Sequence, residues 1–202
     1  MPQIQSLDHA ALRSDDDEIN LTRYQNGDQF PLEKILADTR LWAHGFGDGP
    51  ESQPDTTVAR MHFIQTQILI PERIVYIIRH KSGAYLGVIT YYNPEPENAR
   101  VEIGKLILDP NQWGRGYMAR ALRLLVKNAF DSGYHRVYAE ADVLNQPSIN
   151  VLTGAGLQLE GTRRHSSFHA DGTCRDISVF SLTLADTAIL REHYGILVDP
   201  HH

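Results

Sequence analysis

EIGKLILDPNQWGRGYMARAL, residues 102–122, places a strand, a glycine-bearing turn and the start of a helix in one continuous unit. At a helix N-terminus the first backbone N–H groups lack an intrahelical partner, and the positive end of the helix dipole lies behind them. Gly114 and Gly116 remove side chains that would keep a pyrophosphate away from these amides, and Arg115 can add a charge-assisted contact. The unit therefore predicts a phosphate-binding turn.

An ordinary strand-to-helix turn, with glycines that supply positive φ, is the alternative interpretation of a lone Gly-x-Gly. Two familiar nucleotide motifs are excluded. The chain has no Gly-x-x-x-x-Gly-Lys-Ser/Thr, and Ala119 stands where the dinucleotide fingerprint has its third glycine. What remains is a pyrophosphate held by backbone amides after a strand.

The sequence on either side predicts an α/β fold, a mixed sheet of about seven strands with flanking helices. Expected strands cover residues 19–24, 73–79, 84–92, 101–108, 137–143, 157–164 and 175–184. Expected helices cover residues 31–41, 57–67, 117–130, 147–154 and 184–194. Parallel pairing is expected only across the helices that begin near Tyr117 and Pro147.

Length and composition indicate one domain. A chain of 202 residues, 42% of them hydrophobic, suits a single buried core. Residues 1–17, which include most of an acidic run, are expected to be a flexible lead-in, and residues 18–202 the domain. The chain shows no leader pattern and no apolar run of membrane-spanning length, so no membrane association is expected.

Charge and cysteine content narrow the function classes further. The formal net charge of -6 disfavours a nucleic-acid partner and is compatible with an amine-bearing substrate. Cys174 is the only cysteine, which excludes an intramolecular disulfide and a thiolate zinc site and favours a reducing, cytoplasmic setting. The histidines lack the spacing of a helical metal pair, so no metal site is expected.

Three elements in order carry a family resemblance. The turn at 113–119, with residues 102–104 before it and residues 145–150 and 156–161 after it, resembles the GNAT (Gcn5-related N-acetyltransferase) superfamily. The pattern is most similar to the Rim-type group (RimJ and RimL), which acetylates protein N-termini, notably those of ribosomal proteins. The resemblance extends from about residue 19 to residue 184. Met118 departs from the usual Gly or Ala and narrows the phosphate pocket, and Leu157 stands where Phe is commoner.

The resemblance implies acetyl-CoA as the acyl donor. The backbone of Leu106, Ile107 and Leu108 would pair with the pantetheine arm, and Asn145 would reach that arm from the far side of splayed strands. The pyrophosphate would be held at the turn by Gly114, Arg115, Gly116, Tyr117, Met118 and Ala119.

Direct transfer needs a neutral amine and a donor for the departing thiolate. An α-amine, with a reference pKa of about 7.7–8.0, needs less help than a lysine amine near about 10.4. By resemblance, Glu102 is the candidate base, acting through water, and Ser148 the thiolate donor. The alternatives are a salt-bridged surface glutamate and a serine that satisfies local helix amides. Tyr134 and Tyr138 are alternative donors that fit equally well as packing residues.

The first acceptor class is a protein or peptide N-terminal amine, on resemblance. The rival within the enzyme class is a small amine, such as a polyamine, an antibiotic or an amino-acid conjugate. A non-catalytic acyl-CoA-binding protein is the rival of another class, and it would need neither candidate catalytic residue. The loop at 44–50, together with Trp42, borders the acceptor groove in this family, and it either shapes substrate choice or is an ordinary anchored loop. Many relatives form homodimers, although no seam in this sequence demands one.

Overall fold

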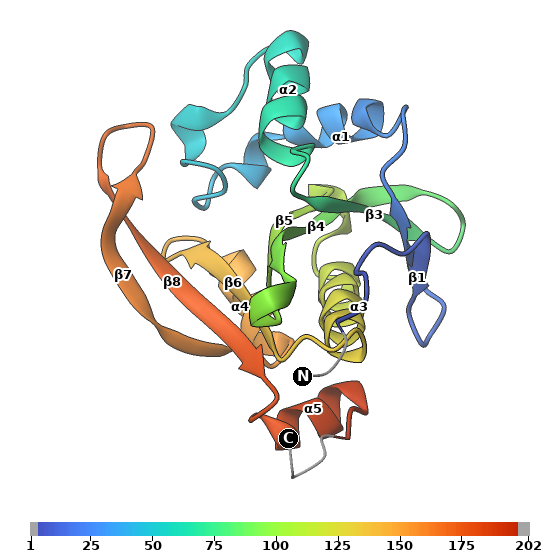
Figure 1. Ribbon diagram of the computed structural model, residues 1–202. Coiled ribbons are helices and arrows are strands. Elements are labelled where there is room, and N and C mark those ends of the chain that lie inside the picture. Colours follow the sequence, from blue (N-terminus) through green and yellow to red (C-terminus); the bar gives the residue numbers. More distant parts are fainter. Residues whose placement is uncertain (1–3, 198–202) are drawn as a thin grey trace.

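The computed structural model describes residues 4–197 and contains one eight-stranded sheet with five α-helices in that range (Figure 1). The strands are β1 (Ala11–Arg13), β2 (Ile19–Arg23), β3 (Ile74–His80), β4 (Tyr85–Glu95), β5 (Arg100–Leu108), β6 (Arg136–Asp142), β7 (Gln158–Phe168) and β8 (Cys174–Thr183). The helices are α1 (Gln29–Leu36), α2 (Thr57–Phe63), α3 (Tyr117–Asp131), α4 (Gln146–Gly154) and α5 (Thr187–Tyr194). The predicted α/β class is confirmed, with one strand more than expected.

The strand order is β1-β2-β3-β4-β5-β6-β8-β7. Every neighbouring pair is antiparallel except β5 and β6, which are parallel over Arg100–Glu102 and Arg136–Tyr138. A parallel pair therefore forms across α3, as expected. None forms across α4, because β8 lies between β6 and β7.

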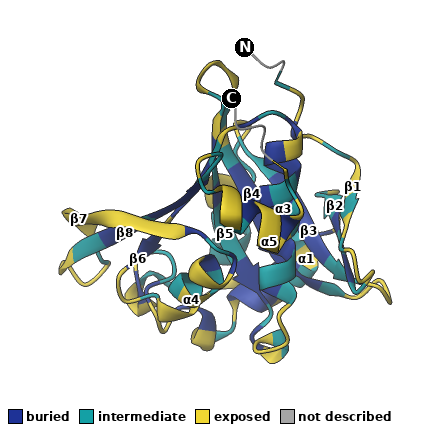
Figure 2. Ribbon diagram, turned by 90° about the horizontal axis from the view of Figure 1, so that it is seen from below, coloured by how far each residue is buried: buried dark blue, intermediate teal, exposed yellow. Residues whose placement is uncertain are grey.

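Two apolar clusters cover the two faces of the sheet. The cluster on the α3 side includes Ala121, Leu125 and Ala129, which belong to the apolar stripe of that helix. The other cluster joins α1 and the segment after α2 to β3, β4 and β5, with Trp42 fully buried in it. Strand β7 is exposed along its whole length and stands away from both clusters (Figure 2).

Three local differences from the expected elements have physical causes. Strand β1, a three-residue strand paired only with β2, lies inside the segment expected to be a lead-in. Helix α1 ends at Leu36, because Asp38 adopts extended backbone and caps a separate 3₁₀ turn at Thr39–Leu41. Strand β7 continues past residue 164 through an irregular register in which His165 has φ +50°. The domain boundary at residue 18 stays a prediction.

Within residues 4–197, no helix combines the length and the apolar character that crossing a bilayer requires.

Candidate active site

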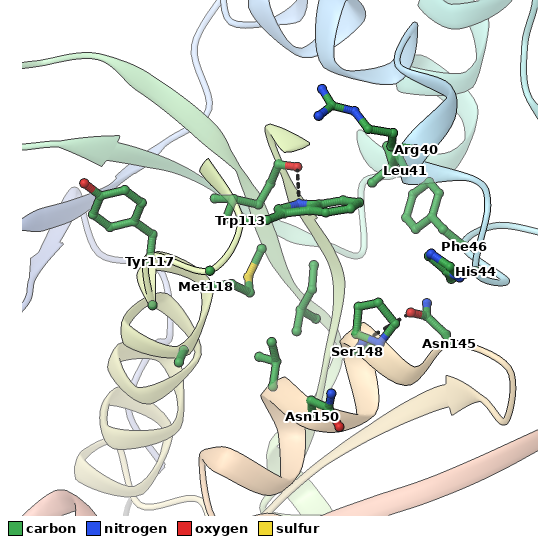
Figure 3. Close-up of a pocket in the computed structure, with 17 residues that line it drawn as sticks. Arg40, Leu41, His44, Phe46, Trp113, Tyr117, Met118, Asn145, Ser148 and Asn150 are labelled. Carbon is green, nitrogen blue, oxygen red and sulfur yellow. Dashed lines mark hydrogen bonds between the residues drawn. The ribbon is translucent and has the colours of Figure 1, made fainter. Parts of the chain in front are cut away.

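The candidate site lies where β5 and β6 diverge. Their pairing ends at Glu102 and Tyr138, yet β5 runs on to Leu108 and β6 to Asp142. Helix α4 begins a short turn after β6, so its first residues face the far half of β5 across the opening. A cavity of about 480 Å³ occupies this opening (Figure 3). It is lined by Arg40, Leu41, His44, Phe46, Leu106, Leu108, Trp113, Gly114, Gly116, Tyr117, Met118, Ala119, Asn145, Pro147, Ser148, Asn150 and Val151.

A bulge in β5 shapes one wall of this cavity. Opposite β4, Thr90 pairs with Gly104 and Val88 pairs with Ile107, so two residues of β5 face one of β4, and Lys105 has φ +45°. Leu106 and Leu108 line the cavity, and their backbone contact with a pantetheine arm stays a prediction. The Ile107 side chain instead lies in the cluster beneath α1, so this residue offers the cavity backbone at most.

The turn that is predicted to bind a phosphate lies at the N-terminus of α3. Gly114 and Gly116 have φ +75° and +77°, the left-handed region that glycine adopts without strain. Gly116 is the N-cap, and a Cβ there would lie 2.8 Å from Arg120 Nη1. Met118, 7% exposed, and four other turn residues line the cavity, namely Gly114, Gly116, Tyr117 and Ala119. Arg115 is exposed and does not line it.

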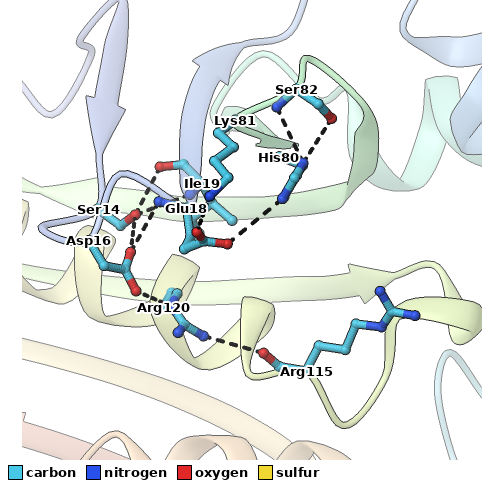
Figure 4. A network of polar contacts seen from close by, with 9 residues as sticks. All are labelled: Ser14, Asp16, Glu18, Ile19, His80, Lys81, Ser82, Arg115 and Arg120. Atoms are coloured by element: carbon cyan, nitrogen blue, oxygen red, sulfur yellow. Dashed lines mark hydrogen bonds and ion pairs between the residues drawn. The ribbon is translucent and has the colours of Figure 1, made fainter.

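A polar network ties the turn to the N-terminal segment (Figure 4). Arg120 donates from Nε to Asp16 Oδ2 at 2.6 Å and from Nη1 to the Arg115 carbonyl at 3.3 Å. Asp16 also accepts from Ser14 Oγ at 2.8 Å. These hydrogen bonds, that of Arg120 first, lower the pKa of Asp16 to about 2, so its carboxylate stays ionised at neutral pH. Residues of the expected lead-in thus support the turn from behind.

Asn145 and Ser148 stand together at the start of α4 (Figure 3). Asn145 is the N-cap, and its Oδ1 accepts from the Ser148 backbone N–H at 3.2 Å. The Asn145 amide group can therefore still donate from Nδ2. Among residues 4–197 the Ser148 hydroxyl has no hydrogen-bond partner, so the capping role falls to Asn145, and the Ser148 Oγ is left toward the cavity.

A second cavity, of about 470 Å³, adjoins the first. The two share Phe46, Leu106, Asn145 and Ser148. Glu102 and Ser148, from β5 and α4, both line the second cavity. The two candidate catalytic residues are thus brought to one space from positions 46 residues apart in the sequence.

The environment of Glu102 suits a proton acceptor. Burial raises its pKa to about 7, and the nearby negative charge of Glu140 adds to the effect against the positive charges of Arg73 and Arg163. Glu102 forms no ion pair with any described residue, which disfavours the salt-bridged alternative. Tyr134 is 2% exposed within the apolar cluster on the α3 side, as expected for a packing residue.

The loop at 44–50 lines both cavities and is anchored from two sides. Trp42 donates its indole N–H to the Leu36 carbonyl at 3.0 Å and packs edge-on against Phe46 at 5.0 Å between ring centroids. At the other side, Asp48 Oδ1 lies 3.0 Å from Arg175 Nη1, and Arg175 Nε donates to Asp142 Oδ2 at 2.7 Å. The loop is therefore a fixed wall shared by the two cavities.

Several residues that line the two cavities carried no predicted site role, among them Trp113, Arg40 and Lys105. Trp113, 38% exposed, donates to the Leu108 carbonyl at 3.1 Å and covers the cavity (Figure 3). Arg40 reaches across to Asn111 Oδ1 at 3.0 Å. Lys105 lines the second cavity. An aromatic residue just before Gly-x-Gly and a lysine inside an apolar strand were the available signals.

No three His, Cys, Asp or Glu side chains gather as a metal site in the described part of the chain.

Comparison with known proteins bears on this arrangement. A sequence profile described as "Acetyltransferase (GNAT) domain" matches residues 18–158. The chain belongs to the GNAT acetyltransferase family. The match contains Glu102, the phosphate-binding turn and the start of α4, which are the GNAT elements anticipated from sequence.

One curated relative, an uncharacterized N-acetyltransferase p20 of Bacillus licheniformis, is 33% identical over 107 residues, 52% of this chain. The matched part spans 59% of that relative's length. Among solved structures, the RimL ribosomal L7/L12 alpha-N-protein acetyltransferase in complex with coenzyme A has a TM-score of 0.69 at 20% identity, over 82% of this chain and 94% of the other. The microcin C7 self immunity acetyltransferase MccE, in complex with acetyl-CoA and AMP, has a TM-score of 0.70 at 19% identity, over 91% and 97%. At these identities the two structures establish the GNAT fold alone.

Proposed function

We propose that this GNAT protein transfers an acetyl group from acetyl-CoA to a primary amine. The observation that carries the proposal is the pair of adjoining cavities. The first is bounded by the phosphate-binding turn and the bulged strand, and the second contains the partly buried Glu102. Three of the four residues that the cavities share, Leu106, Asn145 and Ser148, lie where a thioester would meet an amine.

In the proposed cofactor pose, the free amides at the start of α3 hold the pyrophosphate. The pantetheine arm lies along Leu106 and Leu108, and Asn145 donates to it from α4. Acetyl-CoA is here a cosubstrate. The RimL and MccE structures, which hold coenzyme A and acetyl-CoA, support the choice of this donor.

The proposed reaction is direct transfer. The neutral amine attacks the thioester carbonyl, a C–N bond forms, and the C–S bond breaks. The amine proton passes to Glu102 through water, and the departing thiolate takes a proton from Ser148. Glu102 then releases its proton to solvent and the Ser148 hydroxyl regains one, which restores both groups. Most of the rate enhancement comes from positioning the amine against the thioester and from polarisation of the carbonyl by backbone amides.

The proposed acceptor is a protein or peptide N-terminal α-amine. The Rim-type sequence pattern supports it. So does Glu102, whose pKa of about 7 lies close to that of an α-amine and far from that of a lysine amine. RimL, named for a ribosomal protein, and MccE, named for microcin C7 self immunity, resemble this chain to the same degree, so neither decides between a protein and a small molecule.

The first test is thermal unfolding with and without excess acetyl-CoA. A ligand present at ~100 times its dissociation constant, and bound only by the folded state, adds about 2.7 kcal/mol of stability. An upward shift with acetyl-CoA and a smaller one with ATP support a site built for the whole cosubstrate. No shift with acetyl-CoA contradicts the proposal.

Thiol release then separates an enzyme from an acyl-CoA-binding protein. We expect release with peptide amines, and its loss in Glu102→Gln. An acetyl-CoA-binding protein that releases no thiol with any peptide or small amine is the non-catalytic alternative.

A further inference from the structure

Two cationic residues line the second cavity, Lys105 and Arg175. Arg175 pairs with Asp48 and Asp142, whereas Lys105 has no ion-pair partner among the described residues. The bulge in β5 puts it there. Val101 and Ile103 face the cluster on the α3 side, and strict alternation would send Lys105 to the same face. The bulge turns Lys105 to the opposite face instead, beside the rings of Phe63 and Phe46, whose centroids lie 5.6 Å and 5.9 Å from Nζ.

The other charges at this cavity are matched. Asp48 and Asp142 both pair with Arg175, and Glu140 pairs with Arg163 from outside the lining. Glu102 and Lys105 remain, one acidic and one basic, on the same strand. Glu102 and Lys105 are three positions apart on β5, so at about 3.3 Å per residue their Cα atoms lie about 10 Å apart.

Lys105 carries its charge under ordinary conditions. Burial lowers its pKa to about 8, with the nearby Arg73 acting in the same direction, so the ammonium form still predominates at pH 7. A partly buried ammonium without a counter-ion is costly, and two aromatic rings compensate it only in part. An anion that enters the cavity would supply the missing partner.

We propose that the acceptor carries a carboxylate a few bonds from its reactive amine, with the amine directed to Glu102 and the carboxylate bound by Lys105. The inference rests on the proposed function, because it names the substrate class of the same site. Two sources have this chemistry: an acidic first residue of a peptide, and the α-carboxylate of a free amino acid.

Two pairs of acceptors test the proposal. Glu-Ala-Ala-amide against Gln-Ala-Ala-amide isolates a side-chain carboxylate. Phenylalanine against phenylalaninamide tests an α-carboxylate, with kcat/KM expressed per neutral amine because amidation lowers the pKa of the α-amine. For at least one pair we expect kcat/KM to favour the carboxylate about tenfold in the wild-type protein, the scale of one charge-assisted contact. The pair that shows the preference identifies the source. Equal rates within both pairs overturn the proposal.

Three variants assign the preference to Lys105. In Lys105→Met the ratio should fall to near one, and Lys105→Arg should keep most of it. Lys34→Met is the matched control, because Lys34 is exposed on α1 and lines neither cavity. A preference that survives Lys105→Met overturns the assignment.

A binding measurement keeps this test separate from the proposed activity. The same ligands are titrated calorimetrically into CoA-loaded protein, which requires no turnover. A carboxylate preference in binding, lost in Lys105→Met, supports the anion site even if no acetyl transfer is detected. Transfer to amines without such a preference leaves the proposed function standing and refutes the inference.

Discussion

Glu140 should raise the pH at which the protein becomes active, because its negative charge adds to the effect of burial on the pKa of Glu102. Glu102 pairs with Tyr138 across β5 and β6, and Glu140 lies two residues further along β6. Such diagonal neighbours are about 8 Å apart in regularly paired strands, and because β5 and β6 diverge here this separation is a lower bound. At an effective dielectric constant of about 20, two unit charges at that distance repel by about 2 kcal/mol, or about 1.5 pH units in the pKa of either.

Glu140→Gln removes this repulsion and frees Arg163, which also favours ionised Glu102. After allowance for solvent screening, the acid limb of the kcat/KM profile should move down by about one pH unit. With a wild-type midpoint near 7, the variant should be about fivefold faster at pH 6 and equal to wild type near pH 8.5.

The assay is thiol release from acetyl-CoA with a fixed peptide acceptor between pH 5.5 and 9. The acceptor's own titration is common to both proteins and cancels in their ratio. Glu72→Gln is the control, since Glu72 is an exposed glutamate that lines neither cavity. The reasoning is refuted if the acid limb of Glu140→Gln stays in place or moves to higher pH. It is also refuted if Glu102→Gln keeps the wild-type acid limb, because that limb would then not report Glu102.

The remaining predictions concern Glu102, Ser148 and Asp142. The folded-state pKa of Glu102 lies above its unfolded value, so ionisation of this group lowers the stability of the fold as pH rises from about 4.5 to 7. Glu102→Gln should therefore lower activity yet raise Tm at pH 8. A lower Tm in this variant would contradict the sign of the effect. Ser148→Ala should reduce kcat about 100-fold and leave acetyl-CoA affinity, measured by calorimetry, within about twofold; a loss of affinity alone would make Ser148 a binding residue. Asp142→Ala leaves Arg175 without its buried partner and should lower the free energy of unfolding by about 3 kcal/mol in a urea titration; a change below about 1 kcal/mol would show that Asp48 suffices.

The long periodic elements were predictable from sequence because local pattern determines them. The expected 117–130 helix and 101–108 strand agree with α3 and β5 to within one residue at each end. Strand β1 was not predicted, since three residues carry too little pattern. The place of β8 between β6 and β7 was not predicted either, because strand order depends on packing between segments distant in the chain.

At the site, the sequence indicated which residue types occur and in what order, and the structure showed which face of each element their side chains occupy. Glu102, Ser148 and Asn145 were named by resemblance, and their roles stay predictions. Lys105 was not named, although a lysine inside an apolar strand was a signal, because nothing in the sequence marks the bulge that exchanges the faces of the later side chains. The support of the turn by Asp16 was missed for a similar reason: 104 residues separate it from Arg120.

The placement of β8 has a consequence for the order in which this protein is made. During synthesis β5, α3 and β6 emerge before β8, so the proposed cofactor cavity can form while the chain is still growing. Strand β6 gains its second neighbour only when residues 174–183 arrive, and Arg175, the partner of Asp142 and Asp48, is among them. A nascent chain that stops before Cys174 would contain the turn predicted to bind phosphate, but it would lack the Arg175 contacts that fix the loop at 44–50. Ribosome-bound chains of increasing length should therefore acquire affinity for acetyl-CoA before they can discriminate among amines.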